Sequence, residues 1–409
     1  MDALLFNFHD IVLIMTSYQC ALFALLLLVI RRERRFSNTL LALFLFSQAA
    51  IPLDILINFG DGFRSWSIET SPDLFFVFGA AYWLEGPLLL WYTRSLTREG
   101  FRISRLDLWY LLPFLLAVVF EYFSYWQFDS ETKTAMLRGE NLTTGSMFDH
   151  LLGLARESLR VLFGVLCFFE VRRCRRQIRD NHSSIEKIDL TWLLVLIWGF
   201  LLVRIWAVMI NLAVGLAQEW QFQLDIGAMG LFSNYAVFVL VSAMIFFSLS
   251  YSSMFEGERY KVEKFGENVD SDLEQDASGE PEVDLELAAQ IENYMREEKP
   301  YLIPALTLEQ LSGQLQVSRR LLSQTINRHF QCNFFEFVNR YRIDEAKRML
   351  REPQNGGLTV MEIMLSSGFN TKATFNSFFK KIAGMTPTEY RRLNGEVEVG
   401  KEDRAIEPG

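Results

Sequence analysis

Cysteine and histidine are scarce in this chain of 409 residues, which has four of each. The cysteines are Cys20, Cys167, Cys174 and Cys332, and no C-x-x-C motif or Cys/His cluster occurs. Neither a disulfide framework nor a metal site is therefore expected. The sequence also lacks a glycine-rich phosphate loop, a nucleophile elbow and a histidine-kinase phosphoacceptor region. We accordingly expect a protein that is not an enzyme and that uses no cofactor.

Long apolar runs are plentiful in the first 250 residues. A run of about 20 mainly apolar residues is long enough to cross a bilayer as a helix. The first run has no basic stretch before it and no small-residue cleavage site after it, so we interpret it as a retained span. The predicted spans are the seven runs at residues 11–30, 39–59, 74–92, 108–126, 151–171, 190–214 and 226–250.

The loops between these runs differ sharply in their content of Lys and Arg. Loops 31–38, 93–107 and 172–188 together hold fourteen, whereas residues 1–10, 60–73, 127–150 and 215–225 together hold three. Positively charged loops tend to remain in the cytoplasm. This bias predicts that the N-terminus lies outside and that everything after residue 250 is cytoplasmic. Residues 1–250 are thus expected to form a multi-pass bundle of seven helices in a membrane.

Ionisable residues inside these runs are exceptions, because each costs a few kcal/mol at the centre of a bilayer. They are Glu85, Arg160, Arg204, Arg156, Glu157, Glu121 and Asp54. A rise of ~1.5 Å per residue places Glu85, Arg160 and Arg204 near the midplane and the other four nearer the outer side. Two interpretations stay open. The arginines Arg160 and Arg204 could receive a small polar or anionic ligand in an outward-facing cavity, or they could pair with Glu85 in a structural ion-pair network.

The composition changes abruptly after residue 250. Residues 256–298 hold fifteen acidic and four basic side chains, and the stretch 256–284 has no apolar face. Such a stretch is typical of a solvated, disordered tether, and we expect a flexible acidic cytoplasmic linker over residues 251–283. An alternative is that the acidic stretch folds back onto a basic surface and masks it. Residues 394–409 are expected to form a disordered tail.

Residues 300–393 form a basic region, with thirteen Lys and Arg against seven Asp and Glu. A basic domain behind a flexible linker is typical of a protein that binds nucleic acid. Helix start signals of the form S/T-x-x-E/Q recur there, and each allows a reciprocal pair of cap hydrogen bonds. They are Thr307 with Gln310, Thr359 with Glu362, and Thr386 with Glu389.

Two helix pairs of similar build follow from these signals. The first pair is TLEQLSGQLQ and RRLLSQTINRHF, and the second is TVMEIMLSS and TKATFNSFFKK, with FFEFVNRYRIDEAKRMLRE as a connecting helix between the pairs. In each second helix, apolar residues four apart are predicted to point inward: Leu322 with Ile326, and Phe375 with Phe379. The opposite face is polar and suits base edges and phosphates. It carries Arg319, Arg320, Ser323, Gln324 and Asn327 in the first pair and Lys372, Asn376, Ser377 and Lys380 in the second.

Residues 284–393 resemble the DNA-binding domain of the AraC/XylS family of bacterial transcription regulators. The segment IMLSSGFNTKATFNSFFKKIAGMTPTEYR matches the family's succession of G-F, F/Y, F-K-K and G-x-[ST]-P-x-x-[YF]-R. LTLEQLSGQLQVSRRLLSQTINRHF is similar in length and order to the family's first half. The sequence departs from the pattern at Gln316, where a turn glycine is frequent, and at Met364, where alanine is usual. The resemblance covers about a quarter of the chain.

The resemblance implies two helix–turn–helix units on one rigid connecting helix, with their second helices in successive major grooves of double-stranded DNA. The implied groove-facing residues are Arg319, Arg320, Ser323, Gln324, Lys372, Ala373, Asn376 and Ser377. The resemblance also implies that Lys380, Lys381 and the helix-cap amides near Ser318 and Asn370 contact phosphates. It also admits RNA polymerase as a partner.

Together with the resemblance to a family of bacterial regulators, these features predict a one-component transcription regulator bound to the bacterial inner membrane. The seven-helix half would sense a stimulus and control the DNA-binding half, with the protein acting as a homodimer in the lipid bilayer. The alternative is a transporter or channel that carries a regulatory cytoplasmic DNA-binding domain.

Overall fold

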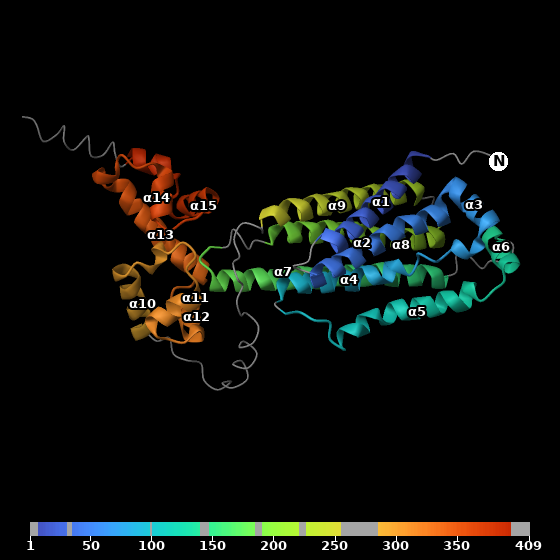
Figure 1. Ribbon diagram of the computed structural model, residues 1–409, viewed down its shortest axis with the longest axis horizontal. Helices are drawn as coiled ribbons and strands as arrows, with labels where there is room; N and C mark the ends of the chain where they lie inside the picture. Colours follow the sequence, from blue (N-terminus) through green and yellow to red (C-terminus); the bar gives the residue numbers. More distant parts are fainter. Residues whose placement is uncertain are drawn as a thin grey trace, which may run out of the picture. The chain divides into compact units, whose positions relative to one another are not determined.

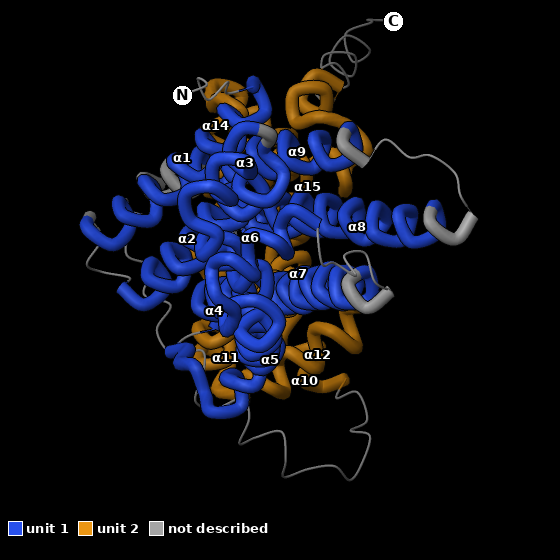
Figure 2. The backbone as a smooth tube through the Cα atoms, turned by 90° about the vertical axis from the view of Figure 1, so that its right-hand side faces the viewer, with its two compact units in different colours: residues 1–172, 190–272 blue, residues 173–189, 273–409 orange. Residues whose placement is uncertain are grey.

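A computed structural model of the chain describes residues 7–30, 35–98, 100–139, 147–184, 190–220, 226–254 and 285–393. These residues form helices joined by turns, and the one β-bridge among them is an isolated antiparallel pairing of His182 with Thr307. The predicted all-α class is therefore confirmed for this part of the chain. The chain divides into two compact units, residues 1–172 with 190–272 and residues 173–189 with 273–409 (Figure 2).

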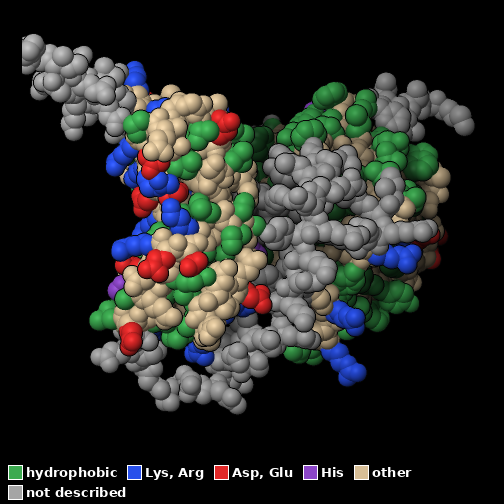
Figure 3. Space-filling model, turned by 60° about the vertical axis from the view of Figure 1, so that its left-hand side comes forward, with side chains coloured by type: hydrophobic (Ala, Val, Ile, Leu, Met, Phe, Trp, Pro, Cys, Tyr) green, Lys and Arg blue, Asp and Glu red, His purple; other side chains and the backbone are tan. Residues whose placement is uncertain are grey.

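Unit 1 is a bundle of long helices together with the short helices α3, α5 and α6 (Figure 1). Its main core joins apolar side chains of α1, α2, α4, α7, α8 and α9, with Leu45 and Leu90 almost fully buried. On the face of unit 1 that Figure 3 shows, the described side chains are mainly hydrophobic. The helices are α1 (Phe8–Ile30), α2 (Arg35–Phe59), α3 (Asp61–Thr70), α4 (Ala81–Thr97), α5 (Leu112–Glu121), α6 (Ser130–Arg138), α7 (Met147–Asn181), α8 (Thr191–Trp220) and α9 (Ile226–Met254).

Five segments in the described residues are long and apolar enough to cross a membrane, judged by length and composition. They are Phe8–Val29, Arg35–Phe59, Asp107–Trp126, Thr191–Ala217 and Ala228–Phe246. They coincide with five of the seven expected spans. The remaining two expected spans, 74–92 and 151–171, correspond to α4 and to the first part of α7. Membrane crossing by any of the seven remains a prediction.

Three boundaries differ from the expectation. Residues 72–80 form a 3₁₀ turn and further turns, with Phe76 at φ 65°, so α4 begins only at Ala81. The expected loop 172–188 is wrong over its first half, because α7 continues to Asn181. The sequence RRCRRQIRDN contains no glycine or proline, and arginine has high helix propensity, so nothing there stops the helix. The expected linker lies outside the described residues apart from 251–254, which end α9, and so does the expected tail.

From α11 onward, unit 2 has the order of helices predicted from the sequence, whereas the helix over Leu285–Glu297 was not predicted. All three predicted capping boxes are present, with Thr307 and Gln310, Thr359 and Glu362, and Thr386 and Glu389 exchanging hydrogen bonds. Among the side chains of unit 2 visible in Figure 3, acidic and basic groups are interspersed. The helices are α10 (Leu285–Glu297), α11 (Leu308–Leu315), α12 (Arg319–Arg328), α13 (Phe334–Arg351), α14 (Val360–Ser366) and α15 (Lys372–Ala383), followed by a helical stretch over 387–393.

The connecting helix α13 is shared by two hydrophobic cores. Phe334, Phe337 and Val338 from its first half pack with side chains of α10, α11 and α12. Ile343 and Leu350 from its second half pack with side chains of α14 and α15. Each helix pair thus has its own core, and the two cores are joined through one rigid element.

Gln316 ends α11 in the left-handed conformation, with φ 57° and ψ 34°. A side chain in this region costs roughly 1–2 kcal/mol because Cβ crowds the carbonyl oxygen, whereas glycine has no such penalty. We therefore expect Gln316→Gly to raise the free energy of unfolding of unit 2 by about 1 kcal/mol. Chemical denaturation of a fragment that spans residues 284–393 measures the change.

Gln314→Gly is the matched control, since Gln314 is exposed inside the same helix. There the substitution should lower stability by roughly 1 kcal/mol. Equal losses at both positions would show that the conformation of Gln316 is not strained.

Candidate nucleic-acid interface and buried charge cluster

The second helices of the two pairs present one apolar and one polar face, as predicted. Leu322 and Ile326 of α12 and Phe375 and Phe379 of α15 are at most 1% exposed. They anchor their helices in the two cores, and the prediction that they point inward is confirmed. The opposite faces are left accessible to a partner.

The start of each second helix is fixed by a side-chain cap. The hydroxyl of Ser318 accepts a hydrogen bond from the amide of Leu321 at α12, and that of Thr371 accepts one from Thr374 at α15. The cap of α15 is therefore one residue beyond Asn370, around which the sequence analysis placed it. Gly368, at φ 88°, makes the preceding turn and lies against the loop before α11, where an added Cβ would meet the carbonyl oxygen of Tyr301 at 2.6 Å.

None of the eleven candidate DNA-contacting side chains is buried. Lys381 is committed to an ion pair with Glu336 of α13, with an Nζ–Oε1 distance of 2.9 Å. The other lysines, Lys372 and Lys380, have no ion-pair partner among the described residues. Arg320, Asn327, Lys372, Ala373, Ser377, Lys380 and Lys381 are exposed, and Arg319, Ser323, Gln324 and Asn376 are half-buried.

Comparison with known proteins supports this description of the C-terminal part. Residues 311–393 match a family model described as a helix-turn-helix domain. This range begins within α11 and includes both second helices. The chain therefore carries a C-terminal helix–turn–helix domain of the type that occurs in AraC-like regulators.

Several bacterial regulators are similar to this region. A putative AraC-like transcription regulator of Streptomyces lividans is 31% identical over 86 residues, which is 21% of this chain and 27% of that protein. The melibiose operon regulatory protein of Escherichia coli (strain K12) is 24% identical over 90 residues, 22% of this chain and 29% of that protein. An uncharacterized HTH-type transcriptional regulator of Bacillus subtilis (strain 168) is 28% identical over 94 residues, 23% of this chain and 31% of that protein.

These matches span less than a third of each of those three relatives. No solved structure matches the chain significantly. The comparisons thus support the type of the C-terminal domain and do not extend to unit 1.

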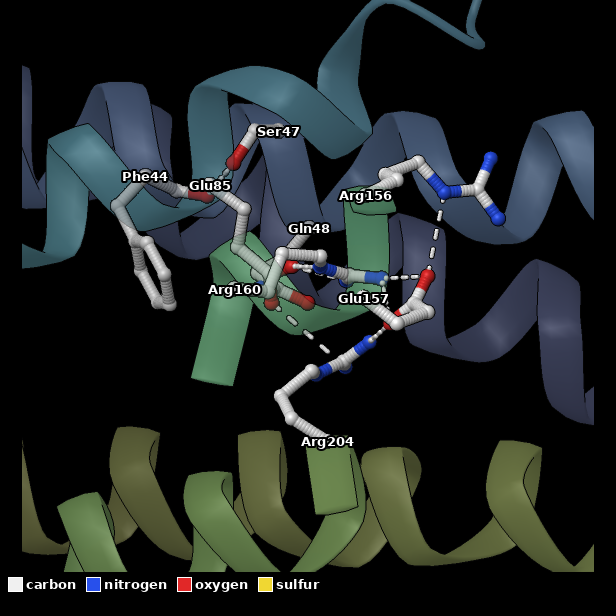
Figure 4. Close-up of polar contacts among 8 residues, drawn as sticks. All are labelled: Phe44, Ser47, Gln48, Glu85, Arg156, Glu157, Arg160 and Arg204. Carbon is white, nitrogen blue, oxygen red and sulfur yellow. Dashed lines mark hydrogen bonds and ion pairs between the residues drawn. The ribbon is translucent and has the colours of Figure 1, made fainter. Parts of the chain in front are cut away.

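Unit 1 contains a second candidate site, a cluster of buried charges (Figure 4). Arg160 of α7 is 2% exposed and donates hydrogen bonds to the carboxylates of Glu85 and Glu157. Its Nη1 lies 2.8 and 2.9 Å from the two carboxylate oxygens of Glu157. Gln48 of α2 donates a further hydrogen bond to Glu85. Because every charge in the cluster is buried, these contacts are what make its ionised state tolerable.

Arg204 of α8 also reaches the cluster, as the sequence predicted, but it is bound less tightly. Its guanidinium nitrogens lie 3.6 Å from Glu85 and 3.8 Å from Glu157, beyond hydrogen-bonding distance. It is 6% exposed, and its Nε has no hydrogen-bond partner among the described residues. Arg204 therefore holds a donor that the cluster leaves unsatisfied.

The other predicted members lie around this cluster. Arg156 stacks on the ring of Tyr82, with its guanidinium carbon 4.2 Å from the ring centroid, and donates a 3.2 Å hydrogen bond to Glu157. Asp54 and Glu121 come close to one another at Gly79 and interact electrostatically with Arg156. The seven predicted residues thus form a tight centre around Glu85 and a neighbouring acidic pair.

Two members were missed or misplaced by the sequence analysis. Glu157 was assigned to the outer side, yet it belongs to the centre of the cluster, because residues three apart on a helix share a face. Its spacing from Arg160 was the available signal. Gln48 carries no charge and gave no signal in an apolar run. It lines a cavity of about 40 Å³ with Glu85, Arg204 and apolar side chains of α2, α4, α8 and α9.

Removing one carboxylate from the cluster should leave buried guanidinium groups without a counter-charge. We expect Glu85→Gln to destabilise the protein by about 3–5 kcal/mol, the usual effect of breaking a buried ion pair. The temperature of unfolding in detergent, followed by the accessibility of buried cysteines, measures this change.

Glu170→Gln serves as the control, since Glu170 pairs with Arg98, whose side chain is 46% exposed. That substitution should lower the free energy of unfolding by no more than about 1 kcal/mol. Equal effects of the two substitutions would contradict a structural role for the cluster.

Proposed function

We propose that the protein is a membrane-bound, one-component transcription regulator whose helical unit 1 controls a cytoplasmic DNA-binding unit 2. The observation that supports this proposal most directly is the pairing of two helix–turn–helix units with accessible polar second helices on a chain that also has five apolar helices. A domain that binds the chromosome gains nothing from such helices unless the chain resides in a membrane.

The DNA-binding mode follows from the shared connecting helix. Because α13 is part of both cores, α12 and α15 are held on one rigid frame. We infer that they enter successive major grooves of double-stranded DNA, with Arg319, Arg320 and Gln324 from α12 and Lys372 and Asn376 from α15 among the contacting residues. Arginine, glutamine and asparagine can form bidentate hydrogen bonds with purine edges, and lysine suits phosphates and guanine.

Membrane residence is supported by the surface of unit 1. In the most apolar 18-residue stretch of Asp107–Trp126, only 11% of the residues are buried inside the protein. In the corresponding stretch of Ala228–Phe246, the buried share is 6%. Large exposed apolar surfaces are rare on soluble proteins and mark contact with lipid or with another protein. We propose that α4 and α7 complete a bundle of seven spans, with the charges of α7 and Glu85 facing the interior of the bundle, where they pair with one another.

The stimulus is proposed to act at the buried charge cluster. Arg160 already donates hydrogen bonds to Glu85 and Glu157, and these carboxylates compete with a ligand for its guanidinium. Arg204 has an unsatisfied Nε and lines the small cavity beside Gln48. A small polar or anionic group that enters this cavity would gain a charge-assisted hydrogen bond from Arg204. The ion-pair network and the ligand site are then two parts of one cluster.

DNA binding should respond to salt and to the charge on α15. The affinity of the full-length protein for duplex DNA should fall steeply as salt rises, because phosphate neutralisation releases counterions. Lys372→Ala should weaken binding to all sequences and reduce the slope of log K against log salt by about 1. Fluorescence anisotropy with a labelled duplex at several salt concentrations measures both effects.

Lys347→Ala is the matched control, because Lys347 is a half-buried lysine of α13 that pairs with Asp344 of the same helix. It should leave the affinity and the slope nearly unchanged. If Lys372→Ala behaved like Lys347→Ala, the assignment of α15 to the DNA interface would be wrong.

The homodimer is proposed to assemble through unit 1. Two DNA-binding units tethered to one dimer raise each other's effective concentration on a two-site operator. We expect mass photometry of the full-length protein in lipid nanodiscs to give dimers and the soluble fragment 284–393 to give monomers. A monomeric full-length protein, or a fragment that dimerises alone, would contradict dimerisation through the membrane half.

A further inference from the structure

A short segment that follows α7 is built into the core of unit 2. Residues 182–184, here named the strap, come directly after Asn181. His182 pairs with Thr307 in an antiparallel bridge, and the amide of Ser183 donates a 3.1 Å hydrogen bond to the carbonyl oxygen of Leu306. Ser183 is only 1% exposed, so the strap is inserted into the domain and does not merely rest on its surface.

The strap is held by the buried centre of α13. Arg342, 1% exposed, donates hydrogen bonds to the carbonyl oxygen of Ser183 at 3.2 Å and to its hydroxyl at 3.1 Å. The side-chain amide of Asn339, one turn earlier, donates to the same carbonyl at 3.2 Å. Arg342 also donates to the carbonyl oxygens of Tyr301, Ile303 and Pro304 in the loop before α11. The strap and this loop therefore share one buried guanidinium.

The strap also contacts the second helix–turn–helix unit. The side-chain amide of Asn370 donates a 3.2 Å hydrogen bond to the hydroxyl of Ser184 and a 3.3 Å bond to the carbonyl oxygen of Pro304. The strap thus bonds to the segment that leads into α11, to the middle of α13 and to the turn that leads into α15. The strap is therefore joined to both helix–turn–helix motifs of unit 2 at once.

These contacts lie at the N-terminal ends of two helices, and one of these, α15, is expected to present its cap amides to phosphates. Thr307 caps α11, and Asn370 immediately precedes Thr371, the cap of α15. Helix N-termini attract phosphate groups through their free amides and the helix dipole. A DNA backbone that approached these helix ends would meet the strap.

We propose that the docked strap is an autoinhibitory element that occupies the phosphate-facing side of unit 2 and must leave before DNA binds tightly. This inference rests on the proposed function, since it requires that unit 2 binds DNA. The strap directly continues α7, which also carries Arg156, Glu157 and Arg160 of the charge cluster. A change in that cluster can thus reach the strap along one uninterrupted helix, and the strap is the point at which unit 1 controls DNA binding.

A reversible cross-link tests this proposal in the intact protein. Directly opposed residues of an antiparallel bridge have Cα atoms about 4.5–5.5 Å apart, which suits a disulfide. His182→Cys and Thr307→Cys are combined in a Cys174→Ser background, because Cys174 is the accessible native thiol. The protein is placed in lipid nanodiscs, and its affinity for a fluorescein-labelled 40-base-pair duplex of random sequence is measured before and after reduction.

We expect the oxidised protein to bind the duplex at least about 5-fold more weakly than the same sample after reduction, the lower end of usual allosteric couplings. Each single-cysteine variant, treated identically, should show no change. Equal affinity in the two states, or tighter binding when locked, would overturn the proposal while leaving DNA binding intact. Absence of binding in both states would overturn the proposed function itself, and the inference with it.

Substitutions in the strap give a second, independent readout. Ser183→Pro removes the amide that bonds to Leu306, whereas Ser183→Ala removes only the hydroxyl that Arg342 contacts. We expect affinity for the duplex to rise in the order wild type, Ser183→Ala, Ser183→Pro. Hydrogen exchange of the α11 and α15 amides distinguishes a released strap, with local loss of protection around residues 306 and 370, from a misfolded domain. A folded Ser183→Pro protein with unchanged or lower affinity would contradict autoinhibition.

Discussion

Burying a guanidinium is costly unless hydrogen bonds compensate for the lost water, and the architecture of unit 2 depends on how Arg342 obtains these bonds. It lies where the two cores of α13 meet, and it collects carbonyl oxygens from the loop before α11 and from the strap. Gly368 can approach this point because it has no Cβ. One side chain therefore fixes the entry to the first helix–turn–helix unit, the turn of the second, and the end of α7. In unit 1, Arg160 donates hydrogen bonds to carboxylates, while the Nε of Arg204 is left without a partner among the described residues.

Much of the C-terminal domain could be predicted because its signals are local. A hydroxyl and a carboxylate or amide three residues apart define a helix start wherever they occur, so Thr307, Thr359 and Thr386 located three helices. Apolar residues four apart, such as Phe375 and Phe379, identified the inward faces. Even the departure at Gln316 was informative, since a residue in place of the usual glycine still adopts the left-handed conformation. The partners of these residues are their own sequence neighbours.

The remaining features could not be predicted, because they depend on contacts between segments far apart in the chain. Ser183 and Arg342 are 159 positions apart, and nothing in HSS indicates a buried strap. Gln48 looks like a stray polar residue until Glu85 is placed beside it. The end of α7 was assigned to a loop because its arginines were interpreted as an orientation signal alone, although arginine is also a good helix former. Counting residues along the helix placed Arg204 at the depth of Glu85 and Arg160. It could not show that the guanidinium of Arg204 would lack a hydrogen-bond partner at Nε.

The central claim is that the domain at residues 285–393 shares a compartment with DNA while the chain is anchored in lipid. Paired fusions after Gly409, one to a fluorescent protein and one to alkaline phosphatase, test it most directly in bacterial cells. The account predicts a fluorescent first fusion, at the membrane, and an inactive second one. An active phosphatase fusion with a dark fluorescent protein would place unit 2 outside the cytoplasm and contradict the account.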